Sequence, residues 1–310
     1  MKELVTAIIT THNRLELLKR AIESVMTQSY PNIELIIVDD HSTDGTDEYC
    51  KQLSISTHNI TYIYIPREQS KGGNYARNLG IKNSHGVYIA FLDDDDIWLP
   101  EKINLQVQLI TDKNCDLVYG NRIVEVIDPN GKSKFYPSKL NPQYEGDVSQ
   151  AILTDIFTTT SLILVRKSIF ELIGLFDEEL KYWQEYELSI RIAQLSPFYA
   201  VHQPLIHYRV NHSDNQRLTN KYYGWHKAVK YIHYKHAELY RNLPLYLKLK
   251  SHALVWHDAA ERCKASDLKI RYIYFQSLWM AFKILNSVKD GSIFSIVKNR
   301  IIKILNRNYE

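Results

Sequence analysis

Four consecutive aspartates, at positions 93–96, follow directly on the apolar run of residues 87–92. The run is rich in β-forming residues and predicts a buried strand. Carboxylates packed at the end of a strand repel one another and raise each other's pKa unless a cation lies between them. A divalent ion with oxygen ligands, Mg²⁺ or Mn²⁺, relieves that repulsion and also suits a substrate phosphate. A solvated acidic turn is the alternative, because aspartate is a common turn residue.

We expect the four carboxylates to divide between two sides of the chain. If the alternation of the strand continues, Asp93 and Asp95 face one side and Asp94 and Asp96 the other. One side would hold the metal, with Asp95 as the main ligand and Asp93 or Asp94 sharing the role. The opposite pair would bond ribose or backbone N–H groups. Trp98, just downstream, is expected to pack rather than to contact a ligand.

Two further stretches are candidates for nucleotide binding. Asp40 follows the apolar run 33–38, where its carboxylate could accept hydrogen bonds from a nucleobase edge or a ribose hydroxyl. A turn with a helix cap is the alternative there, although a cap needs only one carboxylate. In residues 71–78 (KGGNYARN) paired glycines precede a helix that carries Arg77, which could meet a diphosphate or a base. The alternative is a loop with a surface arginine.

Glu185 and Glu187 are candidates for proton transfer. Both lie just before an apolar helical pattern. Carboxylates at a helix start also stabilise the helix dipole, which is the structural alternative. Beside Trp183 and Tyr186, a glutamate could have a raised pKa and serve as a general base. Three later residues could help to bind a phosphate, although a lone histidine is more often structural: His207, Arg209 and His212.

Strand-like and helix-like segments alternate through the first 120 residues and would position these side chains. We expect strands at 4–10, 33–38, 60–65 and 87–92, with helices at 15–27, from about 44, at 74–83 and from Pro100. This alternation predicts an α/β fold with a mainly parallel, doubly wound sheet. Ligands bind such sheets at the carboxyl ends of the strands. The loops that start at Thr10, Asp39 and Asp93 share that edge.

The second half of the chain reads differently. A hairpin is expected around the turn 128–131, followed by a strand at 161–166, a helix at 188–195 and a strand at 205–210. Beyond about residue 219 the pattern is helical. The sequence therefore predicts a domain boundary near residue 216, with an α/β domain over 1–215 and a helical domain over 216–310.

The bulk composition is that of a globular protein: 310 residues, 45% hydrophobic and 24% charged. The sequence contains no apolar run of about 18 residues, so we expect no membrane-spanning helix. The N-terminus lacks the pattern of a signal peptide. The cysteines Cys50, Cys115 and Cys263 lie far apart, which argues against a disulfide framework or a zinc cluster. We expect a cytoplasmic protein, and the net charge of +3 does not indicate nucleic-acid binding.

The basic excess is concentrated in residues 289–310, where five basic residues stand against two acidic ones. Six apolar residues fall at helical spacing in this tail: Ile293, Phe294, Val297, Ile301, Ile304 and Leu305. A last helix packed on its own domain is one interpretation. A helix lying on the inner face of an anionic cytoplasmic membrane is the other, and it would make the protein peripheral to that membrane.

Several strings over about the first 215 residues resemble the inverting, nucleotide-sugar-dependent glycosyltransferases of family 2, of the bacterial cell-surface polysaccharide type. The strings are IITTHNR (8–14), IIVDDHS (36–42), ARNLG (76–80), GVYIAFLDDDD (86–96), GLFDE (174–178) and Tyr208-Arg209. Each is weak alone, but their order and spacing are specific. The resemblance implies the GT-A fold, a Rossmann-like α/β architecture.

The resemblance also implies roles for residues that bind the donor. Thr10 and Asp40 match positions that contact the nucleoside, and Arg77 matches a position near the base and diphosphate. Residues 93–95 match the metal-binding DxD motif. Asp93 and Asp95 are thus expected on the metal, and Asp93 and Asp94 against the nucleotide.

Glu185 matches the catalytic base, but with a departure from the family pattern. The base is usually the aspartate of a Glu-Asp pair, whereas this chain has Gln184-Glu185. The carboxylate is kept and lengthened by a methylene, so Glu187 stays open as the base. The family also often has a histidine two residues after the Tyr-Arg pair; here Asn211 stands there and His212 follows.

The implied reaction moves a sugar from a nucleoside-diphosphate sugar, in the first place a UDP-sugar, to a glycan or lipid-linked acceptor in polysaccharide or lipopolysaccharide synthesis. Mn²⁺ or Mg²⁺ would neutralise the leaving diphosphate, and a general base would take the acceptor proton. One alternative is a nucleotidyltransferase acting on sugar phosphates, but no glycine- and basic-rich loop follows the first strand. A non-catalytic scaffold with the same fold is the other, and carboxylates at every expected position argue against it.

Overall fold

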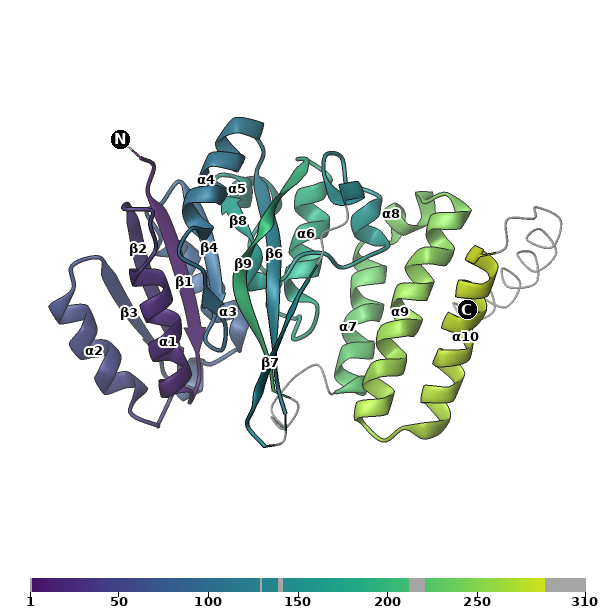
Figure 1. The fold of residues 1–310 in the computed structure, drawn as a ribbon, viewed down its shortest axis with the longest axis horizontal. Helices are drawn as coiled ribbons and strands as arrows, with labels where there is room; N and C mark the ends of the chain where they lie inside the picture. The colour runs from purple at the N-terminus through teal and green to yellow at the C-terminus, as the bar shows by residue number, and fades with distance from the viewer. Residues whose placement is uncertain (1, 129, 139–141, 212–220, 288–310) are drawn as a thin grey trace.

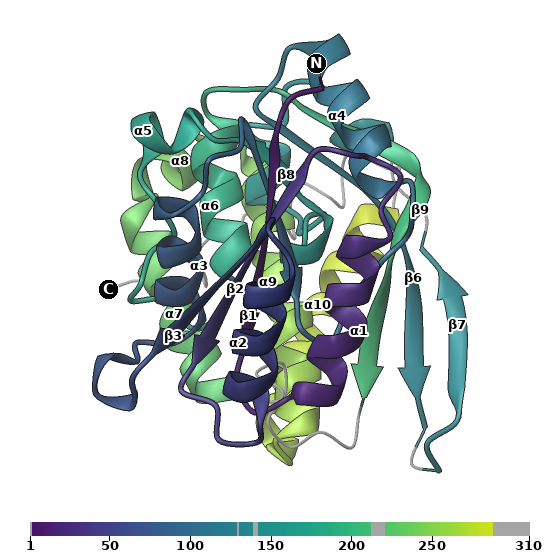
Figure 2. The same cartoon turned by 90° about the vertical axis from the view of Figure 1, so that its left-hand side faces the viewer.

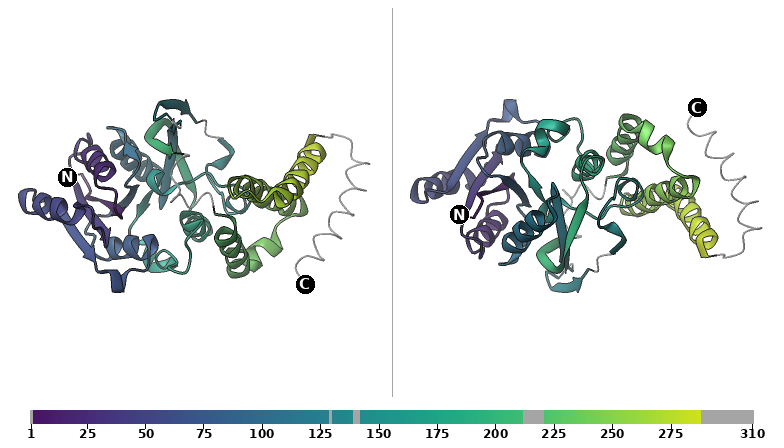
Figure 3. Two further views of the ribbon diagram at one scale, coloured as in Figure 1. Left: turned by 90° about the horizontal axis from the view of Figure 1, so that it is seen from below. Right: turned by 90° about the horizontal axis from the view of Figure 1, so that it is seen from above.

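The computed structural model describes residues 2–128, 130–138, 142–211 and 221–287. Figure 1 shows an α/β part built around one sheet, with a group of C-terminal helices standing beside it. Views from below and above place these helices at one end of an elongated molecule and the N-terminal strands at the other (Figure 3).

One nine-stranded sheet is formed by the described residues, in the order β3-β2-β1-β4-β8-β6-β9-β5, with β7 paired to β6. The strands are β1 (Val5–Thr11), β2 (Ile33–Asp40), β3 (Ile60–Ile65), β4 (Tyr88–Asp93), β5 (Ile97–Trp98), β6 (Leu117–Ile127), β7 (Ser133–Pro137), β8 (Leu164–Arg166) and β9 (Phe198–Asn211). Strands β3, β2, β1 and β4 run parallel to one another, as do β6 and β9. The carboxyl ends of β1, β2 and β4 therefore meet at one edge.

Helices cover both faces of this sheet. In Figure 2, α1 and α3 lie on opposite sides of β1. The α/β part contains α1 (Leu15–Met26), α2 (Thr46–Ser56), α3 (Gly73–Lys82), α4 (Lys102–Lys113), α5 (Ile169–Ile173) and α6 (Gln184–Ala193). The C-terminal helices are α7 (Tyr222–Lys235), α8 (Ala237–Asn242), α9 (Leu245–Ala265) and α10 (Lys269–Ser287).

The structure confirms the predicted α/β class and the hairpin of β6 and β7, and it changes the bounds of several elements. Of the strand expected at 161–166, the second half forms β8, whereas Ser161 and Leu162 belong to a 3-10 turn, Thr160–Leu162. The helix expected at 188–195 begins earlier, at Gln184, because its polar first turn carries no apolar signal. The strand expected at 205–210 is the end of the longer β9.

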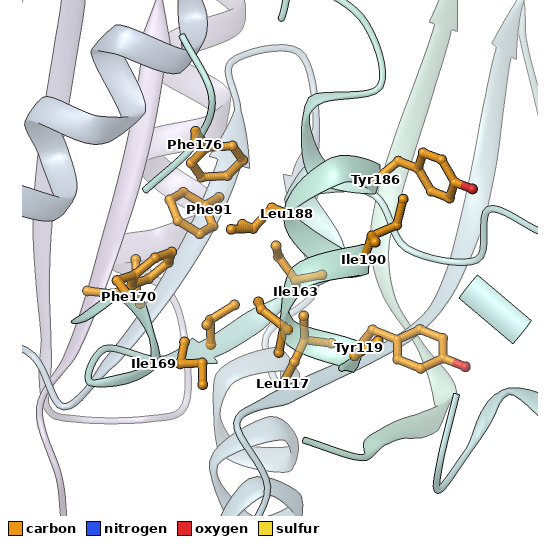
Figure 4. Close-up of a cluster of buried hydrophobic side chains, with 14 of the residues drawn as sticks. Phe91, Leu117, Tyr119, Ile163, Ile169, Phe170, Phe176, Tyr186, Leu188 and Ile190 are labelled. Carbon is orange, nitrogen blue, oxygen red and sulfur yellow. The ribbon is translucent and has the colours of Figure 1, made fainter. Parts of the chain in front are cut away.

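Burial on both faces explains why the central strands read as continuous apolar runs. Ile8, Ile89 and Phe91 face one hydrophobic cluster, whereas Ile9 and Leu92 face the other. Figure 4 shows the first cluster, in which Phe91 lies with side chains of β6, β8, α5 and α6. Since a shift by one residue would move every side chain to the opposite face, this packing fixes the register and hence the height of the loops at the carboxyl edge.

The C-terminal helices share part of the core of the α/β part. Ala228 and Ile232 of α7 belong to the same buried cluster as Phe91, while Trp225 and Cys263 join a separate cluster between α7 and α9. The predicted domain boundary at 215/216 lies outside the described residues, as does the tail 289–310. Within the described part of the chain, no helix is long and apolar enough to cross a membrane.

Gly80 lets α3 lie close to β1 and so sets the position of Arg77 on the same helix. A Cβ at Gly80 would come within 2.6 Å of Ile8 Cγ2, and Ile8 is a core residue with 1% exposure. The ARNLG string therefore combines one residue that faces the sheet edge with one that permits the close approach of helix and strand.

We expect Gly80→Val to destabilise the protein by about 1–3 kcal/mol, because the added methyl groups overpack the contact with Ile8. Urea unfolding followed by circular dichroism measures the change. Lys82→Val, an exposed position on the same helix, is the matched control and should shift the free energy of unfolding by only a few tenths of a kcal/mol. Equal losses in the two variants would contradict the packing role of Gly80.

Candidate active site

A cleft of about 470 Å³ lies at the carboxyl edge of the sheet, within the range of roughly 300–1,000 Å³ of small-ligand sites. It is formed by the loops after β1, β2 and β4, the start of α3 and the end of β9. Six predicted residues line it: Thr10, Asp40, Arg77, Asp93, Asp94 and Asp95. Arg209 lines it as well, whereas Glu185 and His207 are not among its lining residues.

The four aspartates alternate in burial as predicted, since Asp94 and Asp96 are buried while Asp93 and Asp95 are partly exposed, but their partners do not follow this division. Strand β4 ends at Asp93, and the N–H of Asp96 donates to the carbonyl of Asp93 at 3.0 Å, which closes a turn. Asp94 and Asp95, expected on opposite sides, consequently share one partner: Arg14 Nη1 lies 3.1 Å from Asp94 Oδ1 and 3.3 Å from Asp95 Oδ2. The shared partner follows from the turn, which brings the side chains of Asp94 and Asp95 closer together than an extended chain would.

Asp96 is a structural residue at the bottom of this turn. It is 2% exposed and accepts hydrogen bonds from the hydroxyl of Ser161 (2.6 Å) and the backbone N–H of Arg209 (3.0 Å). Burial, together with the charges of Asp95 and Asp93, raises the pKa of Asp96 well above its usual range. Asp96 thus ties the acidic turn to β9 and does not face the cleft. Trp98 is also buried, at 2% exposure, as expected of a packing residue.

Asp94 is buried as well, but it lies beside a cation. Its Oδ2 accepts a hydrogen bond from the Thr11 hydroxyl at 2.8 Å. Burial raises the pKa of Asp94 to about 6, and Asp95 adds to the rise while Arg14 opposes it. The side chains of Asp93 and Asp95 are the more accessible carboxylates, at 35% and 32% exposure against 7% for Asp94.

Arg77 joins the acidic turn to the helix that carries Glu185. Its Nη2 lies 2.7 Å from Asp93 Oδ1, and its Nη1 donates to Gln184 Oε1 at 2.8 Å. The guanidinium also lies 5.8 Å from the centre of the Phe176 ring. Arg77 is 8% exposed, so its orientation is fixed by these contacts before any ligand arrives.

The two aspartates that end β2 have different roles. Asp39 is fully buried and accepts hydrogen bonds from the N–H of Ser42 (2.9 Å) and the hydroxyl of Tyr62 (2.8 Å). Asp40 lines the cleft, with its Oδ1 3.2 Å from His41 Nδ1. The ring of His41 lies 4.4 Å from that of His12, which also lines the cleft.

Sequence reasoning missed Arg14, His12 and His41. The signal was present, since His12 and His41 each follow the last residues of parallel neighbours whose ends meet. His41 has a φ of 55°, a left-handed value that few non-glycine residues adopt. A local sequence pattern does not predict such a conformation.

Glu185 lies in the first turn of α6, next to Arg77's partner Gln184. The residue before this helix, Trp183, has a left-handed φ of 54° and stacks edge-on against Trp225 of α7. Burial raises the pKa of Glu185, and the charge of Asp93 adds to this effect while Arg77 and Arg122 oppose it. A glutamate with a raised pKa is suited to accept a proton near neutral pH.

Glu187 is instead committed to ion pairs. Its side chain is fully buried, and its oxygens lie 2.8 Å from Arg191 Nη2, 2.9 Å from Lys235 Nζ and 3.0 Å from His236 Nε2. Burial alone would raise the pKa of Glu187, but the hydrogen bonds from His236 and Arg191 lower it to about 2. The carboxylate therefore joins α6 to α7, and its low pKa makes it a weak base.

Of His207 and Arg209, the described residues considered beside Arg77 for phosphate binding, Arg209 lines the cleft. Its Nε is buried and has no hydrogen-bond partner among the described residues. His207 packs its ring 5.6 Å from that of Phe135. His212 lies outside the described residues.

We expect Glu187→Gln to lower the free energy of unfolding at pH 7 by about 3 kcal/mol, the value of a shift from the ordinary pKa of 4.5 to about 2. Since the pKa is lowered on folding, this stability is present above pH 4.5 and is lost as the pH falls towards 2. Urea unfolding at pH 7 and pH 3 should therefore show the full difference from the wild type at pH 7 and less than half of it at pH 3. The exposed Glu179→Gln is the control, and a pH-independent loss would contradict the ion-pair account.

Comparison with known proteins agrees with this geometry. The family model for glycosyl transferase family 2 matches residues 6–174 of this chain. An uncharacterized glycosyltransferase of Rickettsia typhi is 32% identical over 212 residues, which cover 67% of this chain and 64% of the relative. TuaG of Bacillus subtilis, a glycosyltransferase assigned to teichuronic acid biosynthesis, is 30% identical over 49% of this chain and 60% of its own length. The chain thus spans less than two thirds of these relatives.

Solved structures show the same fold at low sequence identity. Residues 1–349 of S. aureus TarS, in complex with UDP-GlcNAc, align with a TM-score of 0.63 and 16% identity over 90% of this chain and 79% of that one. The mannosyltransferase PcManGT of Pyrobaculum calidifontis, in complex with GDP-Man and Mn²⁺, aligns with a TM-score of 0.56 and 17% identity over 100% of this chain and 88% of that one. The chain belongs to glycosyl transferase family 2, and its α/β part has a GT-A fold.

Proposed function

We propose that this protein transfers a sugar from a nucleoside-diphosphate sugar, a UDP-sugar, to a hydroxyl of a glycan or lipid-linked acceptor, with inversion at the anomeric carbon and with Mn²⁺ or Mg²⁺. The observation that carries the proposal is the cleft, where Asp40, Arg77, Arg209 and the acidic turn meet at the carboxyl edge. TarS in complex with UDP-GlcNAc supports a UDP-sugar donor, and TuaG supports a role in polysaccharide synthesis. Membrane contact through 289–310 remains part of the proposal.

The donor set of the acidic turn suits a divalent ion held together with the substrate. Among the described residues, no three acidic, histidine or cysteine side chains are arranged to hold a metal by themselves. Mg²⁺-type sites commonly use only one or two carboxylates and complete their shell with substrate phosphates and water. Asp95 and Asp93, the accessible carboxylates, would supply those ligands. The bound ion would neutralise charge that develops on the leaving diphosphate.

Cationic side chains of the cleft would bind the donor. The buried Nε of Arg209 points to a role in holding a phosphate oxygen, since a buried donor without a partner is unfavourable until a ligand accepts its hydrogen bond. Arg77 is already engaged by Asp93 and Gln184, so it would orient the acidic turn beside the diphosphate. Thr10 and Asp40, which also line the cleft, would contact the nucleoside.

Glu185 would act as the general base. As the acceptor oxygen attacks the anomeric carbon, Glu185 takes its proton, the bond from that carbon to the diphosphate oxygen breaks, and the nucleoside diphosphate leaves. Displacement from the face opposite the leaving group inverts the configuration. The raised pKa of Glu185 supports this role over Glu187, whose carboxylate is kept ionised by its hydrogen bonds and ion pairs with His236, Arg191 and Lys235.

A thermal-shift panel of UDP, GDP and CMP, with and without Mn²⁺, tests donor class and cofactor together. We expect only UDP with Mn²⁺ to stabilise the protein strongly, by about 2.7 kcal/mol at a hundred times the dissociation constant. Asp95→Asn should remove the part of the stabilisation by UDP that depends on Mn²⁺. This part should also shrink below about pH 6, where Asp94 takes up a proton. No stabilisation by any nucleotide would refute the proposed function.

Glu185→Gln should lower kcat by about 10²–10⁴-fold while leaving the nucleotide-induced thermal shift unchanged. In the wild type, turnover should fall on the acid side as Glu185 protonates at a pH above the ordinary glutamate range, and the variant should lack this acid limb. Glu179→Gln, an exposed carboxylate just before α6, is the matched control. Full turnover by Glu185→Gln would remove this residue from the mechanism.

A further inference from the structure

A second cavity, of about 230 Å³, lies beside the first cleft. It is formed by Gly120 and Arg122 of β6, by Ser138 and Tyr144 after β7, and by residues 155–159 before the 3-10 turn. Its volume is below the roughly 300–1,000 Å³ of sites for drug-sized ligands, so it suits a small ligand such as a single sugar ring. Nothing in the proposed donor chemistry uses it.

The lining of the second cavity is partly polar, and in the described part of the chain Thr159 lacks a hydrogen-bond partner for its hydroxyl and Arg122 lacks an ion-pair partner. Thr159 Oγ1 is buried and makes no hydrogen bond among the described residues. No carboxylate of the described residues forms an ion pair with the Arg122 guanidinium, which lies over an aromatic ring instead. Asp155 is satisfied, since it accepts hydrogen bonds from the Tyr144 hydroxyl and the N–H of Ile156.

Aromatic side chains form the apolar part of the second cavity. Phe157 and Tyr144 stack with their ring centres 4.6 Å apart and their planes 6° from parallel. Empty cavities in proteins are generally apolar, whereas this one combines aromatic faces with a hydroxyl and a guanidinium. That mixture is typical of a site that orients a small polar ligand.

Arg122 connects the lining of the second cavity with that of the donor cleft. Its guanidinium lies 4.7 Å from the ring centre of Tyr208, which lines the cleft. The pairing of Arg122 with Ile206 and of Val124 with Tyr208 puts both side chains on the same face of the sheet. The charge of Arg122 also acts on Glu185, as does that of Asp93. The proposed base therefore lies within electrostatic reach of both compartments.

We propose that the second cavity is the acceptor site and that Arg122 recognises an anionic group, a carboxylate or a phosphate, on the acceptor sugar. Phe157 would contact the apolar face of the ring, and Thr159 would hydrogen-bond one of its hydroxyls. Glu185 would then meet the hydroxyl that is glycosylated, at the boundary of the two compartments. This inference rests on the proposed function and adds the chemical class of the acceptor.

Binding of three small probes to the full chain tests the inference. Methyl glucoside is neutral, methyl glucuronoside carries a carboxylate, and methyl glucoside 6-phosphate carries a phosphate. Each is titrated by saturation-transfer NMR in the presence of saturating UDP and Mn²⁺, which occupy the donor cleft. We expect at least one charged probe to bind about tenfold more tightly than the neutral one, as one hydrogen bond to a charged group implies. The probe that gains identifies the anionic group.

Two variants and one control separate the acceptor site from a structural cavity. Arg122→Gln should abolish the preference for charge. Arg166→Gln should keep it, because Arg166 also lies over a tyrosine, 5.4 Å from the ring centre of Tyr88, but lines neither cavity. Thr159→Val should weaken all three probes by roughly fivefold. It should fold as well as the wild type, since a buried hydroxyl without a partner becomes a methyl group.

Three results would overturn the inference: equal binding of neutral and charged probes, an unchanged preference in Arg122→Gln, or competition between probe and UDP. If Arg122→Gln does not fold, an unchanged affinity of Thr159→Val for the probes decides against the site. A failure of UDP itself to bind would refute the proposed donor class. Normal binding of UDP together with equal binding of the neutral and charged probes would instead refute only the acceptor site.

Discussion

Four consecutive carboxylates can occupy one sheet edge only because each has a different environment. Asp93 pairs with Arg77, Asp94 and Asp95 share Arg14, and Asp96 is buried under hydrogen bonds from Ser161 and Arg209. Like charges at this spacing would otherwise raise one another's pKa and open the turn. The two carboxylates with the most exposed side chains are the first and third, which are the ones a donor-bound cation would need.

Arg77 links the acidic turn to the first turn of α6. The same guanidinium bonds Asp93 at the end of β4 and Gln184 at the start of α6. Glu185 is the next residue of that helix, so its position depends on the charge balance of the acidic turn. Glu187, two residues further along the same helix, fixes α6 to the C-terminal end of α7 through Lys235 and His236. The helix is thus held between the donor cleft and the C-terminal helices.

Sequence patterns predicted the parts of this site that depend on strand ends. Apolar runs located β2 and β4, and parallel pairing then brought Thr10, Asp40 and Asp93 to one edge. The patterns failed where the chain leaves regular structure. The turn after Asp93 and the left-handed His41 have no period to detect. The two-compartment arrangement also depends on Arg122 and Tyr208, which meet only through the pairing of β6 with β9.

The acidic turn is held on both sides by the sheet. It follows β4, and directly after it the chain enters the sheet again as β5, which pairs with β9 through Ile97 and His207. Asp96 adds a bond from its side chain to the backbone of Arg209 on the same strand. The backbone of the turn consequently cannot shift without disturbing β9, which carries Tyr208 and Arg209. If a donor binds as proposed, we expect rearrangement to come from side chains, above all from Arg14, whose carboxylate partners include the accessible Asp95.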